Sequence, residues 1–546
     1  MKIALAQLNY IIGDFNFNTQ KIISAIHEAK SKGADLVVFA ELSVCGYPPR
    51  DFLEFSEFIE SCENSAQQIA KECNGIACII GIPTKNPNVQ GKDLFNSAYF
   101  IVNGVVQAVV NKALLPNYDV FDEYRYFEPA IDFKCVEFMG HKIALTICED
   151  LWNINDNPMY VTCPMDILIA EKPDLMINIA ASPFAYNHDE ERVLILGDNC
   201  RKYQLPLFYV NQVGAQTEII FDGGSLVFDE TGVLLDEMPY FTEELKVYEF
   251  SEGKVQGLMP VEHKPQGDIE QIHAALVLGI RDYFQKSGFS KAILGLSGGI
   301  DSALVCALAA EALGPENVMA VLMPSEYSSD HSIEDALGLV KNLGCMHEII
   351  PIKEATLAFQ NMMKPVFKDL PFSVAEENMQ ARSRAIVVMA MSNKFGYILL
   401  NTSNKSECAV GYGTLYGDMA GAIGVLGDVY KTQVYKLANY INRDRDIIPQ
   451  NSIIKPPSAE LRPGQKDSDS LPEYDILDAI LFQYIELKKG SESIIHMGFD
   501  EALVRKVLKM VNVAEFKRNQ APPILRVSPK AFGVGRRMPV VGKYLG

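Results

Sequence analysis

The chain has 546 residues, of which 48% are hydrophobic and 22% charged, so it can form several domains with sizeable cores and has the composition of a globular protein. Its net charge of −20 argues against a general nucleic-acid-binding protein, which needs a basic surface. No apolar run approaches the roughly 20 residues of a membrane span, the N-terminal segment lacks the apolar core of a signal peptide, and the eleven cysteines form no CxxC pair. We therefore expect a cytoplasmic protein with reduced thiols and no membrane partner.

The first half alternates short apolar runs with amphipathic segments such as residues 18–32, which predicts an α/β unit with a mixed sheet. The predicted strands cover residues 2–7, 35–39, 77–82, 98–102, 142–147, 175–179 and 207–210. Around residues 251–267 the periodicity gives way to a stretch rich in Gly, Pro and charge, EGKVQGLMPVEHKPQG. We predict that this stretch links a first domain, residues 1–250, to a second domain, residues 268–546.

Three residues of the first half stand where apolar runs end. Glu41 follows the strand LVVFA, Lys112 follows the run GVVQAVVN, and Cys148 follows the strand KIALTI. The end of a strand lies at the rim of a sheet, where sites are built, and a cysteine there can be a nucleophile if a nearby cation favours its thiolate. A buried cysteine that packs as a small apolar side chain is the alternative.

The segments around these three residues resemble the nitrilase, or carbon–nitrogen hydrolase, superfamily over about residues 1–250. The matching stretches are FAEL (39–42), GYPP (46–49), KALLPNY (112–118), RYF (125–127), ICED (147–150) and ASP (181–183). The resemblance implies an α-β-β-α sandwich that hydrolyses glutamine. Glu41 would be the general base, Cys148 the nucleophile that forms a glutamyl thioester, and Lys112 the stabiliser of the oxyanion.

The same resemblance implies which side chains hold glutamine. Tyr118 and Ser182 would bind it, and Glu123 would be an accessory carboxylate. Related amidase domains carry Lys or Arg about six residues after the serine, whereas this chain has His188 there, with Arg192 as a possible substitute. A papain-like Cys–His pair is a rival interpretation, with one of three histidines as the base: His27, His141 or His188.

The second half begins with an amphipathic helix over residues 269–285 and then alternates strands with helices. The predicted elements are strands over 291–296, 318–323 and 397–400 and helices over 300–313 and 332–343. This alternation indicates a parallel, doubly wound α/β sheet. The polar stretch PGQKDSDSLP, residues 463–472, is a candidate mobile loop or lid.

The sequence GLSGGIDS, residues 295–302, lies between a predicted strand and a predicted helix. Its adjacent glycines allow backbone N–H groups to close on a phosphate, and the N-terminus of the next helix favours negative charge. The hydroxyls of Ser297 and Ser302 can donate hydrogen bonds, and Asp301 can hold Mg²⁺. These properties predict a phosphate site.

Other interpretations of this loop stay open at the level of the residues. The lysine of a Walker A loop is missing. The segment also matches GxSxG, the nucleophile elbow of α/β-hydrolases, with Ser297 as the nucleophile. That fold needs a histidine late in the chain, and His496 is the one that lies late enough. A plain tight turn between a strand and a helix is the simplest alternative.

SGGIDS resembles the signature of the PP-loop ATP pyrophosphatases, which cleave ATP between its α and β phosphates. Further stretches resemble the NAD⁺ synthetases in order and spacing: MPSEYSS (323–329), ENMQARSR (377–384), NTSNKSE (401–407), GYGTLYGD (411–418), DVYKT (428–432), KPPSAEL (455–461) and FKRNQAPP (516–523). This resemblance covers essentially the whole second half. It implies a Rossmann-like PP-loop domain.

Site residues follow from this resemblance, motif by motif. ATP would be bound by Thr402 and by the loop residues Gly295, Leu296, Ser297, Gly298, Gly299, Ile300, Asp301 and Ser302. Asn378, Glu407 and Lys517 would contact deamido-NAD⁺. Asp418 and Lys431 would lie at the reacting phosphates. Asp301 and Glu407 would be the Mg²⁺ ligands.

Joined in one chain, the two halves resemble the glutamine-dependent NAD⁺ synthetases. That family implies small-molecule substrates (glutamine, ATP as co-substrate and deamido-NAD⁺), Mg²⁺, no nucleic-acid partner and a homo-oligomer. Ammonia released at Cys148 would displace AMP from an adenylated carboxylate to give NAD⁺. The alternatives are another glutamine-dependent PP-loop amide ligase, or an inactive scaffold that binds nucleotides and senses glutamine.

Overall fold

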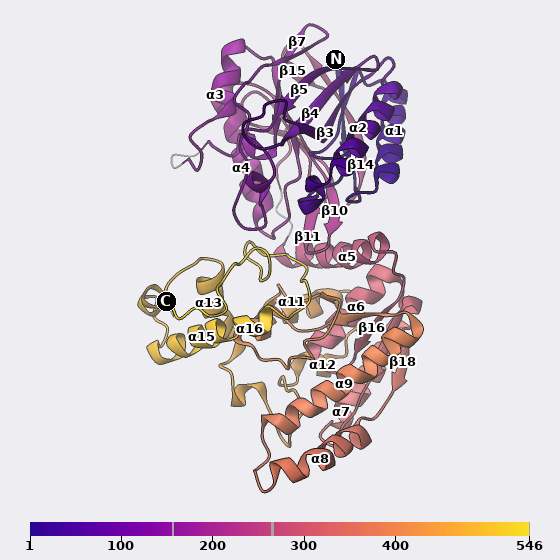
Figure 1. The fold of residues 1–546 in the computed structure, drawn as a ribbon, viewed down its shortest axis with the longest axis vertical. Coiled ribbons are helices and arrows are strands. Elements are labelled where there is room, and N and C mark those ends of the chain that lie inside the picture. The colour runs from indigo at the N-terminus through magenta and orange to yellow at the C-terminus, as the bar shows by residue number, and fades with distance from the viewer. Residues whose placement is uncertain (155–157, 264–266, 545–546) are drawn as a thin grey trace. The chain divides into compact units, whose positions relative to one another are not determined.

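The computed structural model describes residues 1–154, 158–263 and 267–544. The chain divides into two units, Met1–Gln266 and Gly267–Gly546 (Figure 1). Among the described residues, no helix is long and apolar enough to pass through a bilayer.

The first unit extends beyond residue 250. Strand β14 (Glu244–Ser251) pairs with the N-terminal strand β1 (Lys2–Gln7), and β15 (Lys254–Gln256) pairs with β14. A short strand therefore occupies part of the stretch that the sequence predicts as a linker, residues 251–267. Residues 264–266 of that stretch lie outside the described residues.

Two sheets form the middle of the first unit, with strand orders β15-β14-β1-β2-β3-β4-β5 and β13-β12-β9-β8-β7-β6. Helices α1 (Phe15–Ser31) and α2 (Ser56–Glu72) pack on the first sheet, and α3 (Pro164–Leu168) and α4 (His188–Tyr203) pack on the second (Figure 1). The remaining strands are β2 (Leu36–Val38), β3 (Ala77–Lys85), β4 (Leu94–Val102), β5 (Val105–Asn111), β6 (Val136–Phe138), β7 (His141–Ile147), β8 (Leu175–Ala180), β9 (Leu207–Asn211), β12 (Leu226–Phe228) and β13 (Leu234–Glu237), together with the hairpin β10 (Val213–Gln216) and β11 (Ile219–Asp222). The α-β-β-α sandwich implied by the resemblance is confirmed.

The sequence forms these layers because both faces of its central strands are covered. Every residue of β8 is buried, and a strand covered on both faces needs apolar residues at nearly every position. One core cluster lies between the two sheets and includes Leu5, Ile79, Ile177 and Phe208. A second core cluster joins the first sheet to α1 and α2.

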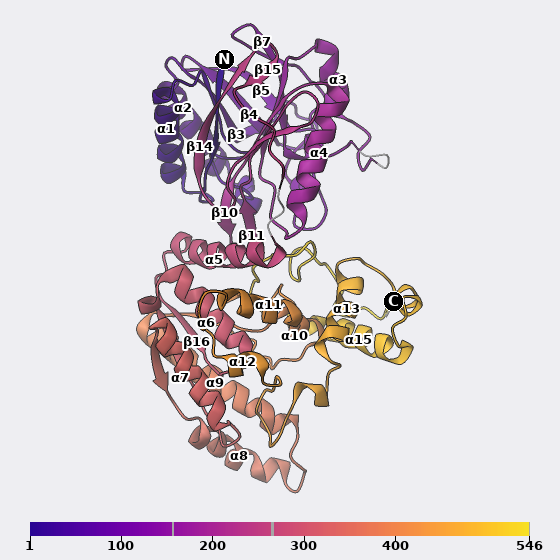
Figure 2. The same ribbon diagram turned by 180° about the vertical axis from the view of Figure 1, so that it is seen from behind.

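The second unit is built on a parallel sheet of order β18-β17-β16-β19-β20. Helices α5, α6 and α11 pack on one another, and α9 packs against β16 and β19 (Figure 2). The strands are β16 (Ala292–Gly295), β17 (Val318–Leu322), β18 (Met346–Ile349), β19 (Ile398–Asn401) and β20 (Ile423–Gly424), and the helices are α5 (Asp268–Lys286), α6 (Ile300–Leu313), α7 (Asp330–Leu343), α8 (Lys353–Phe367), α9 (Val374–Phe395), α10 (Lys405–Val410), α11 (Lys431–Ile441), α12 (Gln450–Ile454), α13 (Tyr474–Ile485), α14 (Ser491–His496), α15 (Glu501–Val513) and α16 (Glu515–Arg518). The predicted parallel α/β sheet is confirmed.

The candidate lid, residues 463–472, has some structure of its own. Its centre forms a short 3₁₀ turn at Asp467–Asp469. The buried carboxylate of Asp467 accepts hydrogen bonds from the hydroxyls of Tyr412, at 3.2 Å, and Tyr474, at 2.9 Å. The turn thus has an anchor at its centre, and its role as a lid stays a prediction.

Candidate active sites

The structure brings the three candidate catalytic residues of the first unit into one buried cluster. Lys112 follows β5, and its Nζ donates to Oε1 of Glu41 at 2.6 Å and to Oε1 of Glu123 at 2.9 Å. Asn96 of β4 also donates to Oε1 of Glu41, at 2.7 Å. Cys148 begins a 3₁₀ turn directly after β7 and has φ of 42°, a left-handed conformation that is uncommon for a residue other than glycine.

Burial and charge set the protonation of this cluster. Burial raises the pKa of the Cys148 thiol well above its usual value, against the opposing influence of Lys112. Burial also disfavours the charged form of Lys112, but Glu123 and Glu41 outweigh it and raise the pKa of the amine. For Glu123, burial raises the pKa to about 7 even though Lys112 opposes it. The thiol is therefore neutral at rest, and it needs a base to become a nucleophile.

The predicted glutamine-binding residues lie around Cys148. The hydroxyl of Tyr118 donates to Glu149 at 3.0 Å. The Oγ of Ser182 lies 3.3 Å from Nε2 of His188, whose ring stacks on Trp152 with centroids 5.1 Å apart. The structure thus places His188 beside the serine, as the spacing predicts.

Arg192 does not serve as the substitute that the sequence allows. Its guanidinium is fully buried and donates to both carboxylate oxygens of Asp222, at 3.0 and 2.9 Å, and to the carbonyl of Gly223 at 3.1 Å. A guanidinium held in this way is a structural ion pair of the protein. That part of the sequence interpretation is wrong.

The papain-like alternative finds no support in the contacts of two candidate histidines. His27 lies on α1 and contacts Glu72 at 3.0 Å, and His141 lies 3.8 Å from Asp174 at the start of β7. The acidic cluster with Lys112 accompanies Cys148 instead, which is the arrangement that the nitrilase resemblance implies.

Sequence reasoning missed several polar groups of this site. Glu149 accepts from Tyr118 and from Tyr160, at 3.0 Å, and Asn96 fixes Glu41. The hydroxyl of Tyr47 donates to Glu123 at 2.8 Å. The position of Glu149 directly after Cys148 was a usable signal. Nothing local marks Asn96.

The predicted phosphate loop of the second unit joins β16 to α6, as expected. Gly298 has φ of 81°, and a Cβ at this position would lie 2.1 Å from the carbonyl oxygen of Ser332, so only glycine fits. The Oγ of Ser297 accepts from the backbone N–H of Gly299 at 3.2 Å and lies 3.1 Å from Oγ of Ser302. The loop is a tight turn that leads into the N-terminus of α6, a helix of fourteen residues.

Charged residues gather directly after this turn. The Nζ of Lys431, at the start of α11, contacts Oδ2 of Asp301 and lies 3.5 Å from Oε1 of Glu407. Asn404 donates to Oδ1 of Asp301 at 2.8 Å. Burial, with Asp301 beside it, raises the pKa of Glu407 to about 8. Burial disfavours the charge on Lys431, but Asp301 and Glu407 outweigh it and raise its pKa.

Three other predicted residues meet at the loop 411–418. The side-chain oxygen of Asn378 accepts from the hydroxyl of Thr414 at 2.7 Å, and Asp418 accepts from the backbone N–H of Thr414 at 2.5 Å. Lys517 donates to the carbonyls of Gly411, at 2.8 Å, and Gly413, at 2.7 Å. Thr402 directly follows β19.

The esterase alternative predicts a histidine beside Ser297. His496, the late histidine, instead lies with Nδ1 2.6 Å from the carbonyl oxygen of Glu492 in α14. The contacts of Ser297 within the described residues are with the loop itself, through Gly299 and Ser302. The loop therefore lacks the partner that a serine nucleophile requires.

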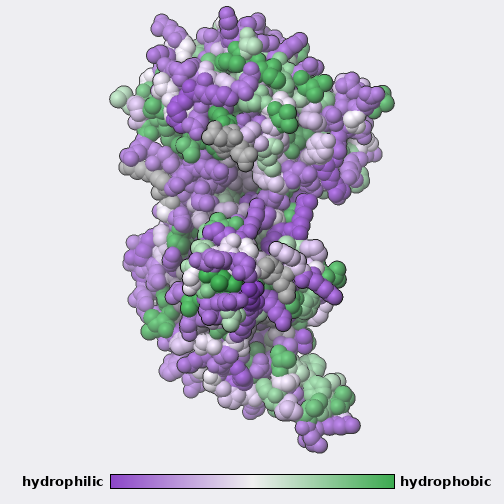
Figure 3. All heavy atoms as spheres, turned by 90° about the vertical axis from the view of Figure 1, so that its left-hand side faces the viewer, coloured by the Kyte–Doolittle hydropathy of each residue, from purple (hydrophilic) through white to green (hydrophobic). Residues whose placement is uncertain are grey.

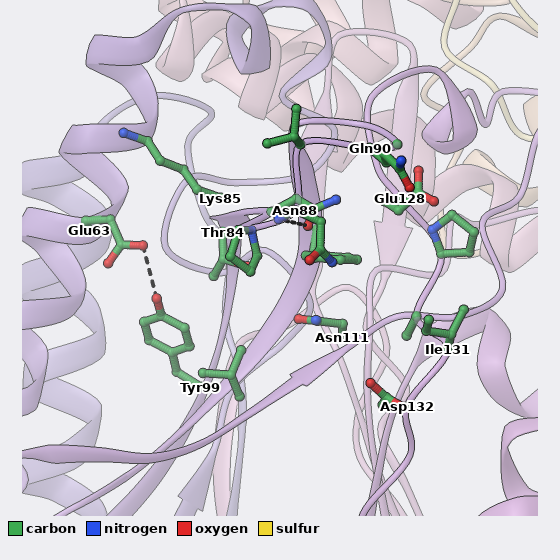
Figure 4. Close-up of a pocket in the computed structure, with 18 of the residues that line it drawn as sticks. Glu63, Thr84, Lys85, Asn88, Gln90, Tyr99, Asn111, Glu128, Ile131 and Asp132 are labelled. Carbon is green, nitrogen blue, oxygen red and sulfur yellow. Dashed lines mark hydrogen bonds between the residues drawn. The ribbon is translucent and has the colours of Figure 1, made fainter.

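A cavity of about 1280 Å³ opens on the first unit between α2, the ends of β3, β4 and β5, and residues 128–132 (Figure 4). Its lining mixes polar residues such as Glu63, Lys85 and Asn111 with apolar ones. None of the predicted site residues lines it. It includes residues of β5, the strand that Lys112 follows, and is not the candidate glutamine pocket.

Comparison with known proteins assigns each unit to a family. Residues 2–258 match the carbon–nitrogen hydrolases, and residues 272–521 match NAD synthase. Together with the geometry of the two sites, these matches define a ligase that joins an amidase-type unit to an NAD synthase unit.

Proteins of this kind match the chain along its length. It is 46% identical to the glutamine-dependent NAD⁺ synthetase of Synechocystis sp., with 98% of each chain covered, and 43% identical to that of Acinetobacter baylyi, covering 99% of this chain and 98% of the relative. A solved glutamine-dependent NAD⁺ synthetase from Acinetobacter baumannii, in complex with adenosine diphosphate, is 39% identical, with a TM-score of 0.79 and 99% of this chain and 98% of that chain covered. The chain belongs to the glutamine-dependent NAD⁺ synthetases.

Proposed function

We propose that the chain divides one synthesis between its two units. The first unit hydrolyses glutamine at Cys148, and the second unit uses the ammonia and ATP to convert deamido-NAD⁺ to NAD⁺. The observation that carries this proposal is the pair of ion clusters, Lys112 with Glu41 and Glu123 beside a thiol, and Lys431 with Asp301 and Glu407 beside a phosphate-type turn.

In the first unit, Glu41 takes the thiol proton as Cys148 attacks the amide carbon of glutamine. Lys112 stabilises the oxyanion that forms. As this intermediate collapses, Glu41 returns the proton to the amide nitrogen, which leaves as ammonia, and a glutamyl thioester remains on Cys148. Water then hydrolyses the thioester with Glu41 again as the base. Glu123 holds the amine of Lys112 from the other side, at 2.9 Å.

Tyr118, Ser182 and His188 hold glutamine in this scheme. The ring of His188 is fixed by its stack on Trp152 and by Glu191, 3.4 Å from its Nδ1. Because its position is fixed, Nε2 is available on the side of Ser182. We assign to His188 the recognition of the glutamine carboxylate that Lys or Arg provides in related domains.

In the second unit, the turn 295–302 and Thr402 hold the phosphates and nucleoside of ATP. Asp301 and Glu407 are hard oxygen ligands that converge on one amine, a donor set that fits Mg²⁺. Mg²⁺ bound there would supply positive charge to the phosphates of ATP. Lys431 lies between the two carboxylates and carries a fixed positive charge of the protein to the same place.

Deamido-NAD⁺ is assigned to the loop 411–418 and to Glu407. Asn378, Asp418 and Lys517 all contact this loop. The nicotinate carboxylate is adenylated by ATP with loss of pyrophosphate. Ammonia then attacks the carboxyl carbon, and AMP leaves.

Two further properties belong to the proposal. Exposed apolar side chains occur on α8, on α9 and in the loop between them, among them Met362, Leu370 and Val374. Figure 3 shows hydrophobic residues gathered at the lower end of its view. Such a patch supports a homo-oligomer. All eleven cysteines are free thiols, which supports a reducing, cytoplasmic location.

Replacement of the nucleophile tests the division of labour. Cys148→Ala should abolish NAD⁺ formation from glutamine and leave NAD⁺ formation from ammonium unchanged, because the second unit needs only ammonia. The matched control is Cys62→Ala, a buried cysteine of α2. Loss of the ammonium-driven reaction in Cys148→Ala alone would contradict two separable sites.

A further inference from the structure

The last described segment of the first unit, residues 258–263, is fastened to the body of that unit; we name it the connecting segment. The backbone N–H of Val261 donates to the carbonyl of Leu234 at 2.9 Å. The Nδ1 of His263 lies 2.9 and 3.1 Å from the two carboxylate oxygens of Glu237. Because a carboxylate accepts, the ring donates there. His263 is thus a fixed point of the chain before the second unit begins at Gly267.

The other nitrogen of His263 faces helix α4. Its Nε2 lies 3.8 Å from Oδ2 of Asp189, too far for a hydrogen bond, and it makes no hydrogen bond to any described residue. The side chain is only 12% exposed, so this nitrogen is enclosed. Asp189 lies in the first turn of α4 and is buried. One imidazole therefore spans the end of β13 and the start of α4.

The N-terminal part of α4 carries one residue that contacts Ser182 and a second that is linked to it through Asp222. His188 precedes Asp189, and its Nε2 lies 3.3 Å from Oγ of Ser182. Arg192, on the same face one turn later, donates to Asp222. A shift of this turn would move both contacts at once.

The second contact continues as a buried chain of hydrogen bonds. Asn211 donates to Oδ1 of Asp222 at 3.3 Å and to the carbonyl of Ser182 at 3.2 Å. The backbone N–H of Ser182 donates back to Oδ1 of Asn211 at 2.9 Å. The side chain of Ser182 therefore contacts His188 of α4, and its backbone is hydrogen-bonded to Asn211, which is linked to α4 through Asp222 and Arg192.

We propose that His263 is a positioning residue for the glutamine site, and that the connecting segment sets the geometry of Ser182 and His188 through the first turn of α4. The inference rests on the proposed function, in that it takes these two residues as the grip on glutamine. Its physical basis is packing geometry: the enclosed imidazole is hydrogen-bonded to Glu237 at the end of β13 and lies against Asp189, so it fixes where the first turn of α4 lies relative to β13. The affinity for glutamine then depends on how the chain leaves the first unit.

The test compares steady-state kinetics of glutamate release in His263→Ala with those of the unchanged enzyme. The KM for glutamine should rise about three- to tenfold, a change comparable to the net contribution of one ordinary hydrogen bond, with kcat within about twofold. NAD⁺ formation from ammonium should stay unchanged. His27→Ala is the matched control, because His27 also contacts a single glutamate of the first unit but lies on α1, outside this network. It should behave as the unchanged enzyme.

Glu237→Gln gives a second, milder variant that weakens the same anchor and should raise KM in the same direction. Unchanged KM in either folded variant, or a fall in thermal stability with KM unaltered, would overturn the positioning role. Ser182→Ala separates this failure from failure of the proposed pocket. If Ser182→Ala leaves KM unchanged, the pocket itself is wrong; if it raises KM and His263→Ala does not, only the role of His263 is lost.

Discussion

The two reaction sites of the chain differ in how their charged groups meet solvent. The side chains of Glu41 and Lys112 in the first unit are 0% exposed, whereas those of Asp301 and Glu407 in the second are 18% and 17% exposed. A buried ion pair retains its charge only when its geometry and hydrogen bonds are good, as they are around Lys112. The partly exposed carboxylates of the second site can still interact with charged groups of a substrate or a bound cation.

The difference matches the chemistry assigned to each unit. The first site acts on one small amide and stabilises a single oxyanion, which benefits from an enclosed, preorganised set of charges. The second site must admit two polyanions, ATP and deamido-NAD⁺. Its two carboxylates therefore stay partly exposed, and a second, fully buried set of charged residues lies next to them in the chain.

This buried set is a network of ion pairs and hydrogen bonds around Lys405. Its Nζ donates to Glu486 at 2.8 Å, contacts Asp428 at 2.9 Å and donates to Oγ of Ser528 at 2.8 Å, and the side chain is 0% exposed. Lys405 directly follows Asn404, which binds Asp301. The comparison is therefore between a unit whose buried charges we assign to catalysis and a unit whose buried charges we assign to supporting the site.

The largest expected effect comes from replacing Lys112, which tests whether the buried charges of the first unit catalyse. Lys112→Met should lower the rate of glutamate release by about 10³-fold, because it removes the positive charge at the oxyanion and leaves Glu41 without its partner. NAD⁺ formation from ammonium should persist. Lys92, a half-buried lysine outside this cluster, offers the control Lys92→Met, which should keep full activity. Glutamate release at the normal rate in Lys112→Met would show that the buried charges of the first unit do not catalyse.

Removing Lys405 tests the other side of the comparison. Lys405→Met should destabilise the second unit by about 3 kcal/mol, because Asp428 and Glu486 would stay buried without their cation. Urea unfolding followed by tyrosine fluorescence measures this change. Lys436→Met, at an exposed position of α11, should be neutral. A loss below about 1 kcal/mol would place Lys405 among ordinary surface charges.

Glu123 has a smaller expected effect, on how the free energy of unfolding depends on pH. Its pKa is about 7 in the fold against an ordinary value of 4.5, so the folded state binds the proton more tightly than the unfolded state. The free energy of unfolding contributed by this group is fully present below about pH 4.5 and falls as pH rises toward 7, by up to about 1.4 kcal/mol per pH unit.

Glu123→Gln should therefore flatten the dependence of the first unit's stability on pH between 5 and 7, within the window that these two pKa values define. Urea unfolding at several pH values measures the slope. Glu137→Gln, on the exposed face of β6, provides a control that should keep the original slope. A slope in Glu123→Gln equal to that of the control would mean that Glu123 titrates as an ordinary carboxyl.

Much of the fold and the main site residues could be predicted because their signals are local. The buried strands are continuous apolar runs; Cys148 directly follows β7, and Glu41 lies three residues after the end of β2. The turn at Gly298 requires glycine for a reason that its position between a strand and a helix already suggests. Each of these signals lies within a few residues of the feature that it predicts.

The groups that support the sites could not be predicted in the same way, because their partners are distant in the chain. Lys405 meets residues 81 and 123 positions away, and Asn96 meets a glutamate 55 positions away. The substitution of Arg192 for a missing lysine failed for the same reason, since Asp222 already holds that guanidinium. Only the folded structure reveals which buried charges are already paired.

The most direct test of two separable sites compares Cys148→Ala with Asp301→Asn in parallel, measuring glutamate release and ammonium-driven NAD⁺ formation for each. The predicted result is reciprocal: Cys148→Ala loses glutamate release and keeps NAD⁺ formation, and Asp301→Asn keeps glutamate release and loses NAD⁺ formation. If either variant loses both activities while remaining folded, or if Asp301→Asn makes NAD⁺ from ammonium at the full rate, the assignment of one reaction to each unit is contradicted.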